Sequence, residues 1–171
     1  MSWFQVHHTS TEMLIYIIFF VFPIIIASAE VKHGDIVVFH DLVVSAKDNK
    51  AYRRQSAPST RFMITKDPFY PSKNNVIMTG KTVMLRVFNT TRTCEYTAQR
   101  IFQCARSSTY LPSTIRILDK HGKDNIPLQS DSLIKFRMPK INIDCSAWGS
   151  QPLSCVTKRP QETYGFVISN T

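Results

Sequence analysis

Hydrophobic and polar residues alternate over short runs along most of this chain, and turn-forming residues separate the runs. Val83, Leu85 and Val87 share one face of such a run, and Arg86 lies on the other. A period of two is typical of half-buried strands. Other runs of strand composition cover residues 35–44, 51–54, 61–65, 114–118, 133–138 and 164–169. Residues 30–171 hold no run with the apolar spacing of an amphipathic helix, so we expect an all-β domain.

One segment has no polar alternation. Met13–Ala29 contains no charged residue and lies between Glu12 and Glu30. Its 17 residues stand at the short limit for a membrane-spanning helix, which needs roughly 17 to 25. The small residues at its end also fit a signal-peptide cleavage site. Residues 1–29 are therefore predicted to be a hydrophobic helix, either a cleaved signal peptide or a retained signal-anchor. The lack of Lys or Arg before the apolar run favours retention.

The pattern of the remaining chain repeats. Cys94–Cys104 and Cys145–Cys155 both enclose nine residues, and the second stretch begins 51 residues after the first. The same offset carries Leu85 onto Phe136. A shorter copy without cysteines opens at Gly34 and matches the opening at Gly80. The sequence therefore predicts three units within residues 30–171.

Three units of about four strands each resemble the β-trefoil, a closed threefold fold capped by three hairpins. The resemblance covers residues 34–171 and depends on the G-x-x-V-x-(L/F) opening and on the aliphatic closing strands. The third unit departs from it, with Asp131 where the others have Gly34 and Gly80. The opening Gly34–Phe39 is also similar to the repeat of MIR-type trefoil domains. A seven-stranded β-sandwich is the alternative fold, and internal threefold repetition argues against it.

The four cysteines follow a hydrophobic leader, which indicates disulfides in an oxidising compartment. Because the two cysteine loops are equivalent in the repeat, we expect Cys94 to pair with Cys104 and Cys145 with Cys155. Four thiolates could instead bind zinc, but zinc ligands are normally two to four residues apart and these are ten apart.

Charge narrows the choice of partner. Residues 30–171 carry 21 Lys and Arg against 11 Asp and Glu, a formal charge of +10. Such a domain favours an acidic glycan, an anionic lipid surface or an acidic protein face, unless the charge only solvates the surface. Placement outside the cell argues against nucleic acid.

No motif for catalysis, a cofactor or a metal occurs, so we expect a binding protein rather than an enzyme. Aromatic rings on the cysteine loops could stack on a sugar or anchor a protein contact, or could pack over the disulfides. Equivalent charged positions of the three units could line one ring, or could be solubilising charges. Asn89-Thr90-Thr91 is a glycosylation sequon. The candidate binding residues are Trp148, Tyr96, Arg86, Arg137 and His40, and the candidate glycosylation site is Asn89.

The architecture has a further resemblance. A short N-terminal apolar segment with Lys32 close behind it and a small disulfide-bearing domain resemble the single-anchor envelope proteins of large insect DNA viruses, including the small per os infectivity factors. The resemblance implies a non-enzymatic component of the envelope complex through which the virus infects gut epithelium. The chain would then be anchored in the virion envelope by Met13–Ala29, beside other envelope proteins. A secreted β-trefoil lectin or inhibitor acting alone is the alternative.

Overall fold

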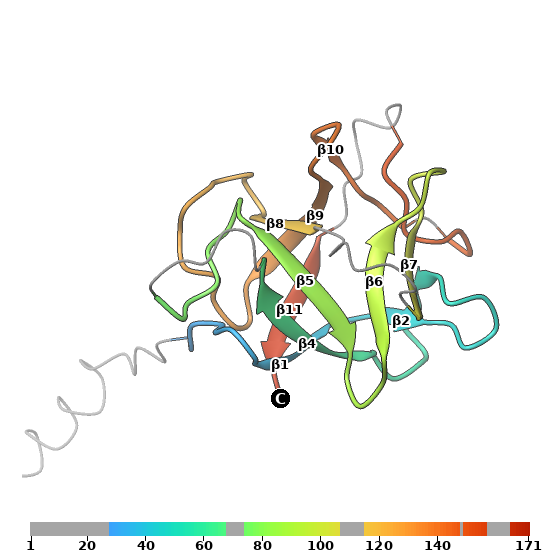
Figure 1. Cartoon of the computed structure of the whole chain (residues 1–171), viewed down its shortest axis with the longest axis horizontal. Coiled ribbons are helices and arrows are strands. Elements are labelled where there is room, and N and C mark those ends of the chain that lie inside the picture. The colour runs from blue at the N-terminus through green and yellow to red at the C-terminus, as the bar shows by residue number, and fades with distance from the viewer. Residues whose placement is uncertain (1–27, 68–73, 107–114, 148, 157–164) are drawn as a thin grey trace, which may run out of the picture.

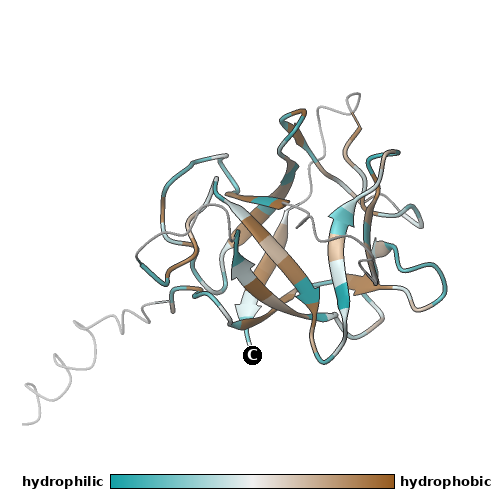
Figure 2. Ribbon diagram, viewed as in Figure 1, coloured by the Kyte–Doolittle hydropathy of each residue, from teal (hydrophilic) through white to brown (hydrophobic). Residues whose placement is uncertain are grey.

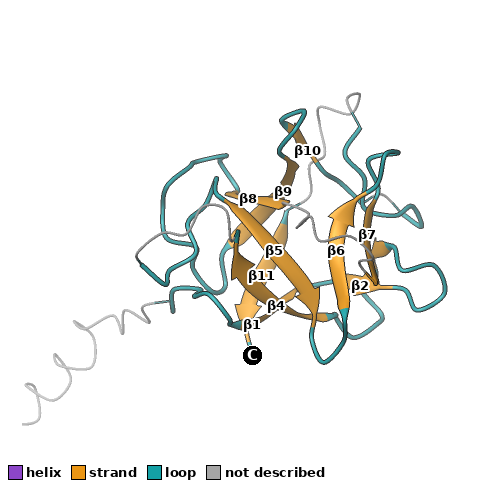
Figure 3. Cartoon of the chain, in the orientation of Figure 1, coloured by secondary structure: helices purple, strands orange, loops and turns teal. Residues whose placement is uncertain are grey.

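The structure is a computed structural model that describes residues 28–67, 74–106, 115–147, 149–156 and 165–171. In these residues the regular structure is all strand (Figure 3), and every strand pair is antiparallel. The strands are β1 (Ile36–Phe39), β2 (Leu42–Val44), β3 (Ala51–Arg53), β4 (Arg61–Lys66), β5 (Thr82–Val87), β6 (Arg92–Tyr96), β7 (Phe102–Arg106), β8 (Ile115–Asp119), β9 (Leu133–Met138), β10 (Ile143–Asp144) and β11 (Phe166–Asn170). The all-β prediction is confirmed. Within the described ranges, no helix is long and apolar enough to cross a membrane.

Six strands form a closed ring. β1 pairs with β4, β4 with β5, β5 with β8, β8 with β9, β9 with β11, and β11 returns to β1. The strands β2 and β3 form a hairpin, β6 and β7 form a second, and β10 extends from β9. Because the sheet closes on itself, the arrangement differs from two stacked sheets, and the β-sandwich alternative does not describe it.

Backbone hydrogen bonds join the three predicted units around one axis. The amide of Val31 donates to the carbonyl of Leu128, that of Ile77 to Val31, and that of Leu128 to Ile77, each at 2.8 Å. All three side chains are buried. This cyclic set relates one residue of each predicted unit to the next, as a trefoil-like arrangement requires. We call the region where the units open, residues 28–34, 74–80 and 125–131, the opening pole.

The hairpins meet at the other end of the ring. Ala51, Phe102 and Leu153 are spaced 51 residues apart and are fully buried. Phe102 donates its amide proton to the Leu153 carbonyl at 2.8 Å, and Leu153 donates to Ala51 at 2.7 Å. We call residues 40–61, 86–106, 137–147 and 149–156 the hairpin end. Figure 1 shows β2, β6 and β7 on the side away from the loops of the opening pole.

The core fills the ring between the two ends, and Figure 2 shows its hydrophobic residues along the strands. Phe136 lies at its centre, with its ring centroid 4.8 Å from that of Phe39 and 5.6 Å from those of Phe102 and Phe166. All four rings are buried. Burying a phenylalanine contributes roughly 1.5 to 3 kcal/mol, so aromatic packing is a major stabilising term.

Two backbone positions refine the sequence predictions. The strand predicted over residues 35–44 is two strands, because Asp41 adopts a φ of 66° and ends the pleat between β1 and β2. Asp131 stands where the other units have glycine, yet its φ of 62° matches the left-handed backbone of Gly34 at 92° and Gly80 at 75°. Aspartate tolerates this region better than most residues, so the third unit keeps the turn.

Candidate functional site

Two disulfides hold the hairpin end. Cys94 lies directly opposite Cys104 across β6 and β7, and these cysteines are bonded, as are Cys145 and Cys155. Their Cα atoms are 3.9 and 4.0 Å apart, and all four side chains are buried. The predicted pairing is confirmed and the zinc alternative is wrong, because the structure contains no free cysteine. The disulfides indicate an oxidising, extracellular compartment.

Tyr96 joins the hairpins of the second and third units. Its ring packs edge-to-face against Phe102, with centroids 5.4 Å apart. Its hydroxyl donates a hydrogen bond to the Cys145 sulfur at 3.3 Å. Burial, and then the charge of Asp144, raise the pKa of the Tyr96 hydroxyl. The ring therefore serves packing, although its hydroxyl contacts the disulfide of the third unit and not that of its own cysteine loop. The other predicted aromatic, Trp148, lies outside the described residues.

The equivalent charged positions of the three units do not line one site. His40 Nε2 lies 2.8 Å from the Ser169 hydroxyl, and Arg86 Nη2 lies 3.3 Å from the Met63 sulfur. Arg137 forms a 2.5 Å ion pair with Asp144 through its Nε atom. Each side chain has its own partners on the outside of the ring. The structure brings none of the three into contact with another.

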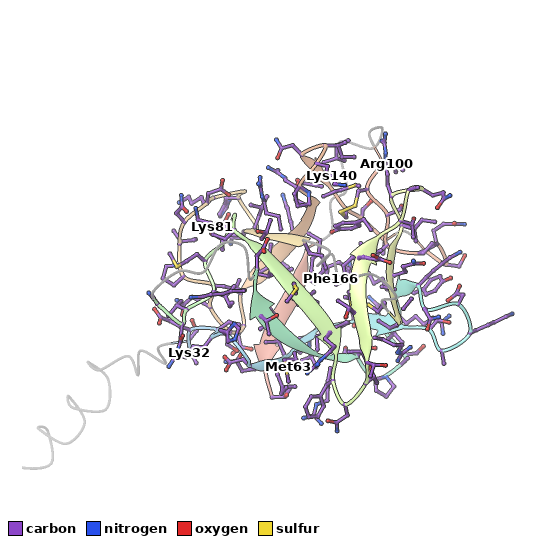
Figure 4. The ribbon with its side chains drawn as sticks, viewed as in Figure 1. Lys32, Met63, Lys81, Arg100, Lys140 and Phe166 are labelled. Carbon is purple, nitrogen blue, oxygen red and sulfur yellow. A yellow bond between two sulfur atoms is a disulfide. The ribbon has the colours of Figure 1, made fainter. Side chains whose placement is uncertain are left out.

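The distribution of arginine is a feature that the sequence analysis missed. The hairpin end carries eleven Lys and Arg against four Asp and Glu, whereas the remaining described residues carry seven against six. Eight of the nine described arginines lie in the hairpin end. Figure 4 shows Arg100 and Lys140 on the side away from Lys32 and Lys81. The formal charge of the described chain is thus concentrated at one end, +7 against +1.

Three arginines of this end rest on uncharged side chains. The guanidinium of Arg61 lies 4.8 Å from the Phe88 ring centroid, and that of Arg54 lies 5.2 Å from the Tyr52 ring. Arg86 contacts Met63. All three are exposed, and none forms an ion pair with a described residue. Their positive charges are therefore available to an external anion.

Asn89 lies beside this surface. It is exposed at the turn between β5 and β6, and its φ of 54° is in the left-handed region. The hydroxyl of Thr90 donates to the Val87 carbonyl at 2.8 Å and so supports the turn. The sequon is accessible on the surface, as expected for an acceptor site.

The opening pole carries a groove of about 420 Å³. Its lining combines the carboxylates of Asp119 and Asp131 with Gln129 and the apolar side chains of Ile126 and Leu133. Ile126 is 39% exposed and Leu133 is 41% exposed. Mixed polar and apolar linings of this kind occur in small-molecule sites. Over the described residues, no group of three or more His, Cys, Asp and Glu side chains could hold a metal ion.

At this pole the predicted hydrophobic segment continues directly into the folded domain, with no spacer between them. The Ser130 amide donates to the Ala29 carbonyl at 2.7 Å, and the equivalent amides of the other units donate to Asn75 and Ile126. The Ser28 hydroxyl also bonds Gln129 at 3.1 Å. The last residues of the predicted hydrophobic segment are thus part of the folded domain.

No protein family and no curated protein matches the sequence, but solved structures match the fold. The lysenin pore matches with a TM-score of 0.57 and 10% identity, over 84% of this chain and 49% of that one, so this chain spans about half the length of that protein. The SDF2-like protein from Arabidopsis thaliana matches with a TM-score of 0.52 and 8% identity, over 84% of this chain and 88% of that one. At these identities the likeness concerns the fold alone. It indicates a trefoil-like, all-β domain.

Proposed function

We propose that residues 30–171 form a β-trefoil that acts as a non-enzymatic interaction module outside the cell, held at a membrane by Met13–Ala29. The closed ring, the cyclic hydrogen bonds of the opening pole and the meeting of three hairpins support the trefoil assignment. The two buried disulfides support an exoplasmic location.

The hydrogen bond from Ser130 to Ala29 carries the proposal. Cleavage before Glu30 would remove the Ala29 carbonyl and break one of three equivalent bonds at the opening pole. Losing a partner for a buried amide costs about 1 to 3 kcal/mol, so the fold favours a retained segment. Because a residue spans at most roughly 3.6 Å, a segment ending at Ala29 would hold the pole against the bilayer. The hairpin end would face outward, toward partners.

We assign this module to the envelope complex through which a large insect DNA virus enters gut cells. The support is the single-anchor architecture, to which the fold adds a small disulfide-bonded domain with no spacer from its membrane segment. Other envelope proteins are then its neighbours in the membrane plane.

The orientation can be measured with a matched pair of lysines. Lys32 at the opening pole and Lys140 at the hairpin end are both exposed (Figure 4). The full-length chain, reconstituted in liposomes, is treated with a membrane-impermeant amine reagent and analysed by mass spectrometry. We expect acylation of Lys32 to be several-fold slower than that of Lys140, because lipid headgroups shield it. Equal rates would contradict attachment through the opening pole.

The groove favours a second function, a secreted lectin or inhibitor acting alone. Its carboxylates and amide could bind sugar hydroxyls, and Ile126 and Leu133 could contact a pyranose face. If the chain has this function, we expect the mature protein to begin at Glu30 and to bind a neutral oligosaccharide. Loss of that binding in an Asp119→Asn variant, with the fold intact, would support it.

A further inference from the structure

We propose that the hairpin end binds a sulfated polysaccharide. The inference names a partner for the outward face of the interaction module and therefore rests on the proposed function. It starts from the segregation of arginine from lysine. The basic side chains of the hairpin end are eight Arg and three Lys, and those of the remaining described residues are one Arg and six Lys.

Arginine and lysine differ in what they recognise. A guanidinium presents planar, paired donors that match two oxygens of a sulfate, phosphate or carboxylate, whereas an ammonium acts as a point charge. A surface that served only solubility would use either residue at either end. Concentration of arginine in one place therefore points to oxyanion recognition.

The geometry of the exposed arginines supports this binding. Arg61 and Arg86 project from the adjacent strands β4 and β5, where Met63 pairs with Arg86 and the Phe88 amide donates to the Arg61 carbonyl at 2.9 Å. Arg61 lies over the Phe88 ring, and Arg86 contacts Met63. Contacts with neutral side chains restrict both stems without neutralising their heads. Neighbouring anions along a polymer could thus contact two positioned guanidinium groups.

The distribution favours a polymer over a small anion. Basic residues of the hairpin end come from all three units, with Arg54, Arg92 and Lys140 as examples. A linear chain with repeated sulfates can contact such a spread surface at several places. An acidic protein would offer carboxylates with an apolar centre, and the exposed arginines of this end lie on half-buried side chains instead.

Location selects the polysaccharide among polyanions. The disulfides indicate an extracellular surface, where sulfated glycans occur and nucleic acid does not. The six-residue ring strands span roughly 20 Å, and charge is screened over about 8 to 10 Å at physiological salt. The hairpin end would therefore lie beyond the field of the membrane that holds the opening pole.

The test uses the full-length chain in a neutral detergent, with fluorescein-labelled heparin decasaccharide as the probe and anisotropy as the readout. We expect Arg61→Gln with Arg86→Gln to weaken binding about tenfold or more. Arg61→Lys with Arg86→Lys should weaken it less, because the charges remain. The slope of log affinity against log salt should fall by roughly 1.5 in the Gln pair, since two ionic contacts are lost. Lys120→Gln with Lys123→Gln removes the same charge near the opening pole and should change affinity less than twofold.

Several outcomes would overturn the proposal. One is the absence of measurable binding by the wild-type chain. Another is a loss of affinity in the Lys120→Gln with Lys123→Gln variant that equals the loss in the Arg61→Gln with Arg86→Gln variant. The third is binding of hyaluronan or polyglutamate as tight as that of heparin. The last result would mean that carboxylate polymers or acidic proteins fit equally well. Thermal melting and disulfide mapping of each variant ensure that a loss is not unfolding. The lysine acylation measurement is independent of heparin, so failure here leaves the anchored orientation standing.

Discussion

The two disulfides close loops of the same size, yet we predict that they contribute unequally to stability. In the chain-entropy account each loop stabilises the fold by about 3 kcal/mol. The Cys145 sulfur also accepts a hydrogen bond from the Tyr96 hydroxyl, whereas within the described residues no tyrosine hydroxyl is hydrogen-bonded to the Cys94–Cys104 pair. Removing Cys145 therefore leaves a part-buried hydroxyl without its partner, which adds about 1 kcal/mol.

The assay is urea unfolding of oxidised chains that begin at Ser28, followed by circular dichroism. We expect Cys94→Ala with Cys104→Ala to lower the free energy of unfolding by about 3 kcal/mol, and Cys145→Ala with Cys155→Ala by about 4 kcal/mol. In a Tyr96→Phe background the difference should disappear, because the hydroxyl is gone. Equal losses in the wild-type background, or a difference that survives Tyr96→Phe, would refute the assigned role of Tyr96.

Three further predictions follow from single positions. The raised pKa of Tyr96 means that its proton stays bound in the folded state above pH 10, where the unfolded chain loses it, so stability should fall as pH rises above about 10. Tyr96→Phe should reduce this alkaline loss of stability in urea titrations at pH 9 to 11. If the free energy of unfolding falls with pH as steeply as in the wild type, the raised pKa of Tyr96 does not cause the loss. Gly165→Ala should destabilise the fold by more than about 1 kcal/mol, because a Cβ atom would lie 2.8 Å from the Ile134 carbonyl oxygen. In the control Gly122→Ala the new Cβ meets open space, so the free energy of unfolding should fall only by the cost of placing alanine at a φ of 77°. A larger fall in the control than in Gly165→Ala would contradict the packing argument. Asn89→Gln should remove one endoglycosidase-sensitive mass increment from chain made in a secretory host, and an unchanged mass would show that the sequon is unused.

The repeat made the architecture predictable. Equal spacing of the cysteines identified the disulfide pairs, and alternation identified the ring strands to within two residues at each end, except at the end of β1. Both signals are local or periodic, so one sequence is enough to read them. The break at Asp41 was missed because residues 35–44 have uniform strand composition, and a left-handed φ at aspartate leaves no signal in that pattern.

The candidate site was less predictable because it depends on how the units dock. Tyr96 and Cys145 are far apart in the chain and meet only where two hairpins pack. The arginine-rich end was hidden for a related reason: its members come from strand ends and hairpin turns in different units, and only the closed ring shows that these parts lie together. Arg86 and Arg137 were singled out as candidate binding residues, but the exposed heads of Arg54 and Arg61 were overlooked.

The intact mass of the mature chain tests the central claim, attachment through the opening pole, most directly. The chain is isolated from producing membranes and measured by mass spectrometry together with its N-terminal peptide. The account predicts that Met13–Ala29 is retained, because the Ala29 carbonyl accepts the Ser130 amide in the threefold set of the opening pole. A mature chain that begins at Glu30 would contradict the account and favour a free secreted ligand.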